Sequence, residues 1–167
     1  MLLYNKALDP YHTLLRFIVV LTSIGNKTIE DERLRIFDFI MANPSHIEKM
    51  SLGQELLQEK NIFKKYRSVY NHFDPIMLFE SMRPIQQAVV SSLLEMTVLT
   101  NLEGTTRYQI NLANVSEGLA EIAQDDQNSI PRDVVAFING HLVDFDLLGE
   151  KGLKGASKLM EFRYDFV

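Results

Sequence analysis

The 167-residue sequence contains no cysteine, and this absence removes several classes of protein at once. Without a thiol, the chain can form no disulfide framework, bind no zinc through thiolates and use no cysteine nucleophile. A chain without cysteine suits the reducing cytosol, so we expect a cytoplasmic protein. The N-terminus has no charged stretch followed by an apolar one, so we expect no secretory signal peptide.

Long hydrophobic runs and surplus positive charge are also missing. The most apolar stretch, Leu14 to Ile24, is interrupted by Arg16 and is shorter than the roughly 20 residues that a transmembrane helix needs. We therefore expect a buried helix there and no membrane span. The net charge is −5 and the pI is near 5.4. This balance disfavours nucleic acid or an anionic membrane as the main partner.

Motifs for catalysis or cofactor binding are scarce. Gly149 to Ser157 resembles a phosphate-binding loop, but Lys154 stands where that motif needs glycine. We interpret the stretch as a mobile tail with glycine hinges, and we expect no cofactor. No histidine pair has the spacing of a helical zinc site. His141, Asp144 and Asp146 are the one group with metal-ligand chemistry, and we interpret them as polar positions on a solvated segment. An enzyme is the least favoured function.

Two helices are predicted near the N-terminus. Asp9-Pro10 places a capping side chain before a proline with helical φ, and Gly25 allows the helix to end. Its apolar residues cover nearly the whole circumference, so we expect burial on all sides. Thr28 to Asp31 resembles a capping box that opens a second helix through Met41.

A winged-helix layout is predicted for the middle of the chain. An apolar-periodic helix over Pro84–Glu95 is followed by two β-prone runs, 96–99 and 107–112, around a loop with a glycine. A further helix is expected over 115–123. The predicted fold is mainly α with a small antiparallel β-hairpin: a winged-helix-like domain with additional N- and C-terminal helices. We divide the chain into that domain, residues 1–124, and a helical extension, residues 125–167, that docks on the domain or on a partner.

The predicted wing lacks the charges needed to bind DNA. Between Ser81 and Leu112 the charged residues are Arg83, Glu95, Glu103 and Arg107, which sum to zero. Because each neutralised phosphate adds affinity, a DNA-binding surface needs several net positive charges. We expect this surface to contact protein.

One basic patch remains as a nucleic-acid candidate. It consists of Lys60, Lys64, Lys65 and Arg67, with Tyr66 and Tyr70 interleaved. A short helix is expected over 62–70, and on a helix Lys60, Lys64 and Arg67 fall on one face. The patch is either a solvated helix face or an addition to a partner's DNA path in an assembled complex.

Three strings of residues carry a family resemblance. They are 4–12 (YNKALDPYH), 32–39 (ERLRIFDF) and 83–86 (RPIQ). Together they resemble the middle component of ABC-three-component systems, the type numbered fifth, over most of residues 4–123. The resemblance implies a small accessory subunit encoded between an SMC-like ABC ATPase and an effector such as a nuclease, as in Lamassu-type antiphage defence. It implies no ATP site in this chain and DNA contact only through the assembled complex.

The leading hypothesis is therefore a non-catalytic subunit that bridges the ATPase and the effector. The alternative is a winged-helix transcriptional regulator, which the layout alone supports. Residues 2–8 are too apolar for a free terminus, so we expect them to lie in a partner interface or to cap their own core. The candidate interface residues are Tyr4, Asp9, Tyr11, Arg33, Arg35 and Asp38.

Overall fold

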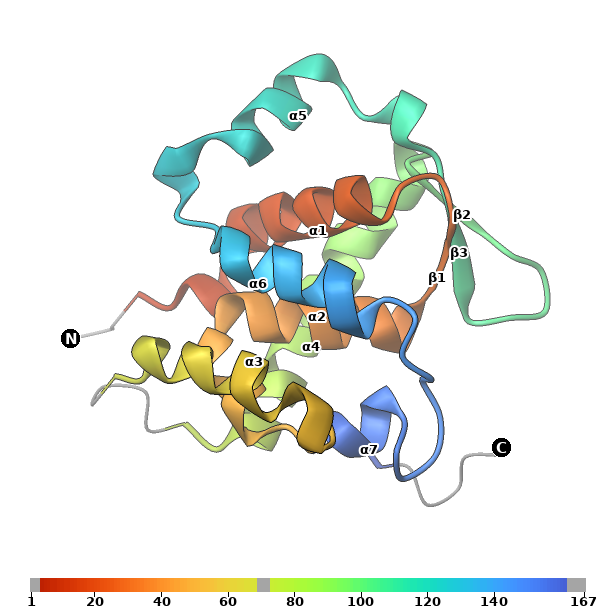
Figure 1. The fold of residues 1–167 in the computed structure, drawn as a ribbon. Helices are drawn as coiled ribbons and strands as arrows, with labels where there is room; N and C mark the ends of the chain where they lie inside the picture. The colour runs from red at the N-terminus through yellow and green to blue at the C-terminus, as the bar shows by residue number, and fades with distance from the viewer. Residues whose placement is uncertain (1–3, 69–72, 162–167) are drawn as a thin grey trace.

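Helices make up most of the protein, and one small antiparallel sheet lies at one side of them (Figure 1). The computed structural model describes residues 4–68 and 73–161. The α-helices are α1 (Pro10–Ile24), α2 (Asp31–Ala42), α3 (Leu57–Asn61), α4 (Pro75–Glu95), α5 (Glu117–Gln124), α6 (Arg132–Phe137) and α7 (Leu153–Ser157). The strands are β1 (Thr28–Glu30), β2 (Leu99–Asn101) and β3 (Arg107–Ile110). The predicted fold class, mainly α with a small antiparallel β element, is confirmed.

Short helical turns connect these elements. The 3₁₀ turns are η1 (Lys6–Leu8), η2 (Pro44–Lys49), η3 (Gln54–Leu56), η4 (Ile62–Tyr66), η5 (Leu112–Asn114) and η6 (Asp126–Asn128), and η7 (Ile138–Leu142) is a π-helical turn. In the part of the chain that the structure describes, no helix is long and apolar enough to cross a membrane.

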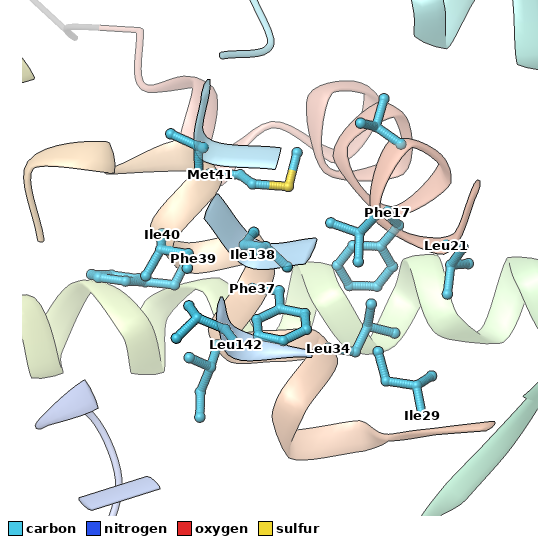
Figure 2. Close-up of a cluster of buried hydrophobic side chains, with 14 of the residues drawn as sticks. Phe17, Leu21, Ile29, Leu34, Phe37, Phe39, Ile40, Met41, Ile138 and Leu142 are labelled. Atoms are coloured by element: carbon cyan, nitrogen blue, oxygen red, sulfur yellow. The ribbon is translucent and has the colours of Figure 1, made fainter. Parts of the chain in front are cut away.

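Helix α1 lies at the centre of the core, as its all-round apolar pattern predicts. Asp9 caps its start by accepting from the backbone N–H of His12 at 3.0 Å, and Gly25 ends it with a φ of 87°. Nearly every side chain from Leu15 to Leu21 is buried. Figure 2 shows α1 and α2 side chains packed together with Ile138 from the C-terminal part of the chain. The first helix is therefore predicted correctly in position and burial.

The sheet contains one strand that the sequence does not reveal. Its order is β1-β3-β2, all antiparallel, and β2 with β3 is the predicted hairpin. The predicted capping box at Thr28 is wrong, because Thr28–Glu30 is strand β1 and α2 begins at Asp31. Backbone pairing with β3, such as Ile29 with Tyr108, holds this segment extended.

Helix α4 begins earlier than the helix predicted over Pro84–Glu95. Asp74 caps its start by accepting from the N–H groups of Ile76 and Met77, and the helix then continues through Pro84 to Glu95. A proline removes one helical hydrogen bond and normally ends or kinks a helix. Here the helix buries one face on both sides of the proline, with Phe79 and Met82 before it and Gln86 and Val89 after it. Packing on the core therefore outweighs the local signal.

The segment after η2 is less helical than predicted. The predicted helix over 62–70 is the 3₁₀ turn η4, which ends at Tyr66 and is followed by an extended Arg67. The candidate cations therefore do not share one regular helix face. Tyr70 and the aromatic end, residues 162–167, lie outside the described residues, as do Leu2 and Leu3.

The C-terminal part packs into the same core as the rest. Buried residues of α6, η7 and α7, including Val134, Ile138 and Leu153, join one cluster with α1 and α2. The prediction of a mobile tail over 149–157 is wrong, because α7 lies in this stretch with Leu153 and Ala156 buried. The division at residue 124 stays an interpretation.

Candidate partner interface

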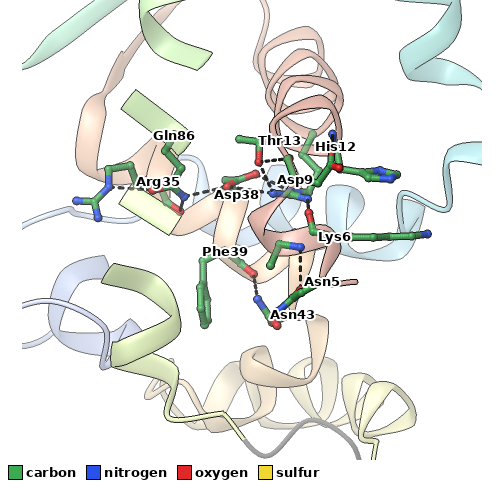
Figure 3. A network of polar contacts seen from close by, with 12 residues as sticks. Asn5, Lys6, Asp9, His12, Thr13, Arg35, Asp38, Phe39, Asn43 and Gln86 are labelled. Carbon is green, nitrogen blue, oxygen red and sulfur yellow. Dashed lines mark hydrogen bonds and ion pairs between the residues drawn. The ribbon is translucent and has the colours of Figure 1, made fainter. Parts of the chain in front are cut away.

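A buried polar network joins α1, α2 and α4 in the middle of the fold (Figure 3). Asp38 of α2 accepts from Arg16 Nε at 2.6 Å and from Gln86 Nε2 at 2.8 Å. Arg35 Nε donates to Gln86 Oε1 at 3.0 Å. All four side chains are buried. A buried carboxylate is stable only when it is paired and hydrogen-bonded, and this network supplies both conditions for Asp38.

The same network holds the N-terminal segment in place. Arg16 Nη1 donates to the carbonyl of Lys6 at 3.0 Å, and Arg16 Nη2 donates to Thr13 Oγ1 at 2.9 Å. Ala7, the middle residue of η1, is buried, and η1 contacts α1, α2 and α4. Asp38 therefore orders residues 5–8 through Arg16.

Arg35 is the least satisfied member of the network. It is 4% exposed, and its Nη2 has no hydrogen-bond partner among the described residues. Its guanidinium lies 4.5 Å above the ring of Phe79, and its Nη2 is 4.0 Å from Glu80 Oε1. Burial, together with the positive charge of Arg83, lowers the pKa of Arg35. Glu80 is shared, because it also pairs with Arg83 at 2.9 Å.

Arg33 of α2 connects strand β1 to η7. Its Nε lies 2.7 Å from Glu30 Oε2, and its Nη1 donates to the carbonyl of Leu142 at 3.0 Å. Burial opposes ionisation of Glu30, but the hydrogen bond and charge of Arg33 overcome it and lower the pKa of that carboxyl. Arg33, like Arg35 and Asp38, is buried by its own chain.

The exposed candidates lie at the N-terminus. Tyr4 is 67% exposed and Tyr11 is 53% exposed, and the Tyr4 hydroxyl donates to Asp9 at 2.8 Å. The N–H of His12 and this hydroxyl lower the pKa of Asp9. The rings of Tyr4 and His12 lie 6.2 Å apart. Asp9 therefore fixes Tyr4 while it caps α1.

A shallow apolar groove of about 300 Å³ lies between η1 and the start of α4. Leu8, Phe73 and Met77 line it, and Ile76 is exposed on the same turn of α4. We call Leu8, Phe73 and Met77 of this groove, together with the exposed Ile76 beside them on α4, the N-terminal surface. Large apolar side chains gathered from distant parts of a chain are a common mark of a protein interface.

The sequence misses two kinds of residue at this site. Arg16 and Gln86 are central to the buried network but were not candidates. Arg16 had a usable signal, because an arginine inside an otherwise apolar, buried helix needs a carboxylate partner. No local sequence pattern marks Phe73, Ile76 and Met77 as interface residues, because the η1 residue that shares their surface, Leu8, is distant in sequence.

The basic patch is largely engaged within the chain. Lys60 Nζ donates to the carbonyl of Met50 at 2.7 Å, Lys65 Nζ lies 2.7 Å from Asp133 Oδ2, and Arg67 pairs with Glu48. The hydrogen bond from Arg67 lowers the pKa of Glu48. Lys64 is exposed. Its role and that of the patch in nucleic-acid binding stay predictions.

Histidines and acids do not gather into a site in residues 4–68 and 73–161, where no group of three could hold a metal ion. His46 is buried with Nε2 2.7 Å from the carbonyl of Ser157, and burial lowers its pKa. The ring of His141 packs on Phe137 with 5.0 Å between centroids. Both histidines therefore have packing roles in this fold.

The comparison with known families covers almost the whole chain. The family model described as ABC-three component (ABC-3C) system Middle Component 5 matches residues 2–165. No curated protein and no solved structure matches the chain significantly. The match includes the buried network, the N-terminal surface and the C-terminal helices, and it extends beyond the residues 4–123 of the resemblance. The chain therefore belongs to the Middle Component 5 family of ABC-three-component systems.

Proposed function

We propose that this middle component is a non-catalytic accessory subunit that links an SMC-like ATPase to an effector in an antiphage defence complex. Membership of the family implies partnership with the other components of its system. The observation that carries the bridging role is the N-terminal surface, where Phe73, Ile76 and Met77 are about half exposed or more. Such a surface is stabilised when a partner removes it from water.

The buried network supports this role by making the surface rigid. Through Arg16, Asp38 holds the Lys6 carbonyl, and η1 packs on α4 beside Met77. An interface that is ordered before binding loses less conformational entropy on association. The buried candidates Arg35 and Asp38 thus act as positioning residues, and the exposed Tyr4 and Tyr11 are candidates for direct contact.

A winged-helix transcriptional regulator is the second candidate, and the order of the elements favours it. Helix α4 is followed by the hairpin β2–β3 and then by α5, which is the order of the predicted winged-helix layout, and the unpredicted strand β1 extends the sheet to the order β1-β3-β2. Against this function stands α4, the helix that would enter the DNA groove. Its cation, Arg83, is already paired with Glu80, and Glu95 adds negative charge.

Co-expression with the ATPase and effector encoded beside this chain tests the proposed function. We expect tagged wild-type protein to co-purify with both components. Met77→Asp places a charge in the N-terminal surface and should weaken retention of one component by about tenfold or more. The isolated variant should melt as wild type does, because Met77 is 69% exposed.

Ile122→Asp on α5 is the matched control, since Ile122 is another exposed apolar side chain, at 44%. It should leave co-purification intact. Point substitution is preferable to removing residues 1–8, because Ala7 and the Lys6 carbonyl belong to the core. A wild-type chain that retains neither component overturns the proposed function. Normal retention by Met77→Asp overturns only the assignment of this surface.

A further inference from the structure

A second groove lies on elements that the N-terminal surface does not use. It runs between α3 with η4 on one side and α6 with η7 on the other, and its volume is about 510 Å³. We call it the α3–α6 groove. Its lining includes Glu59, Ile62 and Phe63 from the first wall and Asp133, Phe137 and His141 from the second. This volume suits a few side chains of a bound segment.

The floor of the α3–α6 groove is a packed row of aromatic rings. The centroids of Phe63 and Phe137 are 5.1 Å apart in an edge-to-face arrangement, and His141 lies 5.0 Å from Phe137. Phe63 and Phe137 are buried, while His141 is exposed at the open side. Rings fixed in this way form a surface that needs no rearrangement to accept an apolar side chain.

The lip of the groove is apolar and exposed. Ile62, which lines the groove from η4, is 54% exposed. An aliphatic side chain held at the mouth of a preformed groove favours the entry of another apolar group, because contact removes both of them from water.

The charged groups of the lining are both acidic. Glu59 is exposed and has no ion-pair partner among the described residues, whereas Asp133 is held by Lys65 and by the hydroxyl of Tyr66. Glu59 is therefore the carboxylate available to a ligand. Charge complementarity indicates an occupant with positive charge next to its apolar part.

We propose that the α3–α6 groove binds an amphipathic segment of a protein partner, with a large apolar side chain between Ile62 and His141 and a lysine or arginine facing Glu59. The inference rests on the proposed function in one respect: a bridging subunit needs two surfaces. The N-terminal surface is built by η1 and α4, and this groove is built by α3, η4, α6 and η7. Each surface serves one partner.

Two blocked peptides test the chemistry on the isolated full chain. The basic probe is acetyl-Lys-Phe-Leu-Lys-amide, and the acidic probe has glutamate in place of both lysines. NMR should show a saturable shift of the Ile62 methyl signals with the basic probe and no shift at Ile122, with binding of the acidic probe at least about fivefold weaker. No saturable shift at Ile62, or equal binding of the two probes, overturns the proposal.

Charge reversal then tests the role of Glu59. Glu59→Lys should remove the preference for the basic probe, while Glu121→Lys, at an exposed position on α5, should leave it unchanged. Both residues are exposed, so both variants should fold. A preference that survives Glu59→Lys overturns the assignment of this carboxylate.

Photo-crosslinking in the purified complex identifies the partner. Benzoylphenylalanine replaces Ile62 in one sample and Ile122 in the control. The expected crosslink from position 62 is to a segment of the ATPase or effector with lysine or arginine beside an apolar residue. Crosslinks only within this chain, or none, overturn the groove proposal while the intact complex upholds the proposed function. If no complex forms, the proposed function fails and the peptide result decides for the groove.

Discussion

The carboxylate of Asp38 on α2 connects α1 and α4 in the buried interior. Asp38 is 1% exposed and its carboxylate is shared by Arg16 and Gln86, with Arg35 connected through Gln86. The buried guanidinium of Arg16 pairs with Asp38. The buried guanidinium of Arg35 has its nearest carboxylate in Glu80 at the surface, with 4.0 Å between Nη2 and Oε1. Removing the Asp38 charge leaves positive charges in a region of low polarity without compensation.

We expect Asp38→Asn to destabilise the protein by about 3–5 kcal/mol, although the side chain keeps its size. Urea unfolding followed by circular dichroism measures the change. Asp144→Asn is the control, because Asp144 is exposed and its substitution should be nearly neutral. A loss below about 1 kcal/mol for Asp38→Asn would show that the network contributes little to stability.

Helix α7 shows how an element with weak local signals is held in place. Its backbone approaches the preceding loop closely at Gly152 and Gly155, where an added Cβ would overlap the carbonyl oxygens of Leu148 and Glu150. Lys154 pairs with Glu32 at 3.5 Å, and the Ser157 carbonyl meets His46. These glycines are therefore needed for close packing and not for mobility.

We expect Gly155→Ala to lower the midpoint of thermal unfolding, with a cost of about 1–3 kcal/mol, because the new methyl group meets rigid backbone. Gly140→Ala is the matched control. A Cβ there meets nothing within 4 Å, so that variant should be neutral or slightly more stable. Equal melting curves for the two variants would contradict the tight approach of α7 to residues 148–150.

The charge of the whole molecule argues against independent DNA binding. The net charge is −5, and the cations of the basic patch that make contacts bond within the chain: Lys60 to Met50, Lys65 to Asp133 and Arg67 to Glu48. On α4, Arg83 is paired with Glu80. Among the described cations of the basic patch and α4, Lys64 is therefore left to replace phosphate counterions.

We expect the isolated protein to show no binding to a labelled duplex of mixed sequence at physiological salt. Fluorescence anisotropy at two salt concentrations makes the measurement. Salt-dependent binding that weakens on Arg83→Ala or Arg107→Ala would favour the transcriptional regulator instead. A contribution of the basic patch inside a complex would appear as a smaller salt slope when Lys60, Lys64, Lys65 and Arg67 are all alanine.

The features that can be predicted from the sequence are local ones. Asp9-Pro10 and Gly25 set the two ends of α1, and the glycine-bearing loop between two β-prone runs set the hairpin. Three short strings of residues resembled the fifth middle component of ABC-three-component systems, and the family match confirms that resemblance. Caps, turns and hydrophobic periodicity each depend on residues that are close together in the chain, so the elements they specify can be predicted without a structure.

Only the tertiary structure decided the features that depend on distant partners. Strand β1 forms because β3 lies beside it, and α4 continues through Pro84 because one face of the helix is buried on both sides of the proline. Asp38 is satisfied by Gln86, 48 residues away, and Arg33 by the Leu142 carbonyl, 109 residues away. No local pattern specifies such contacts, since each depends on the packing of helices that are far apart in the chain.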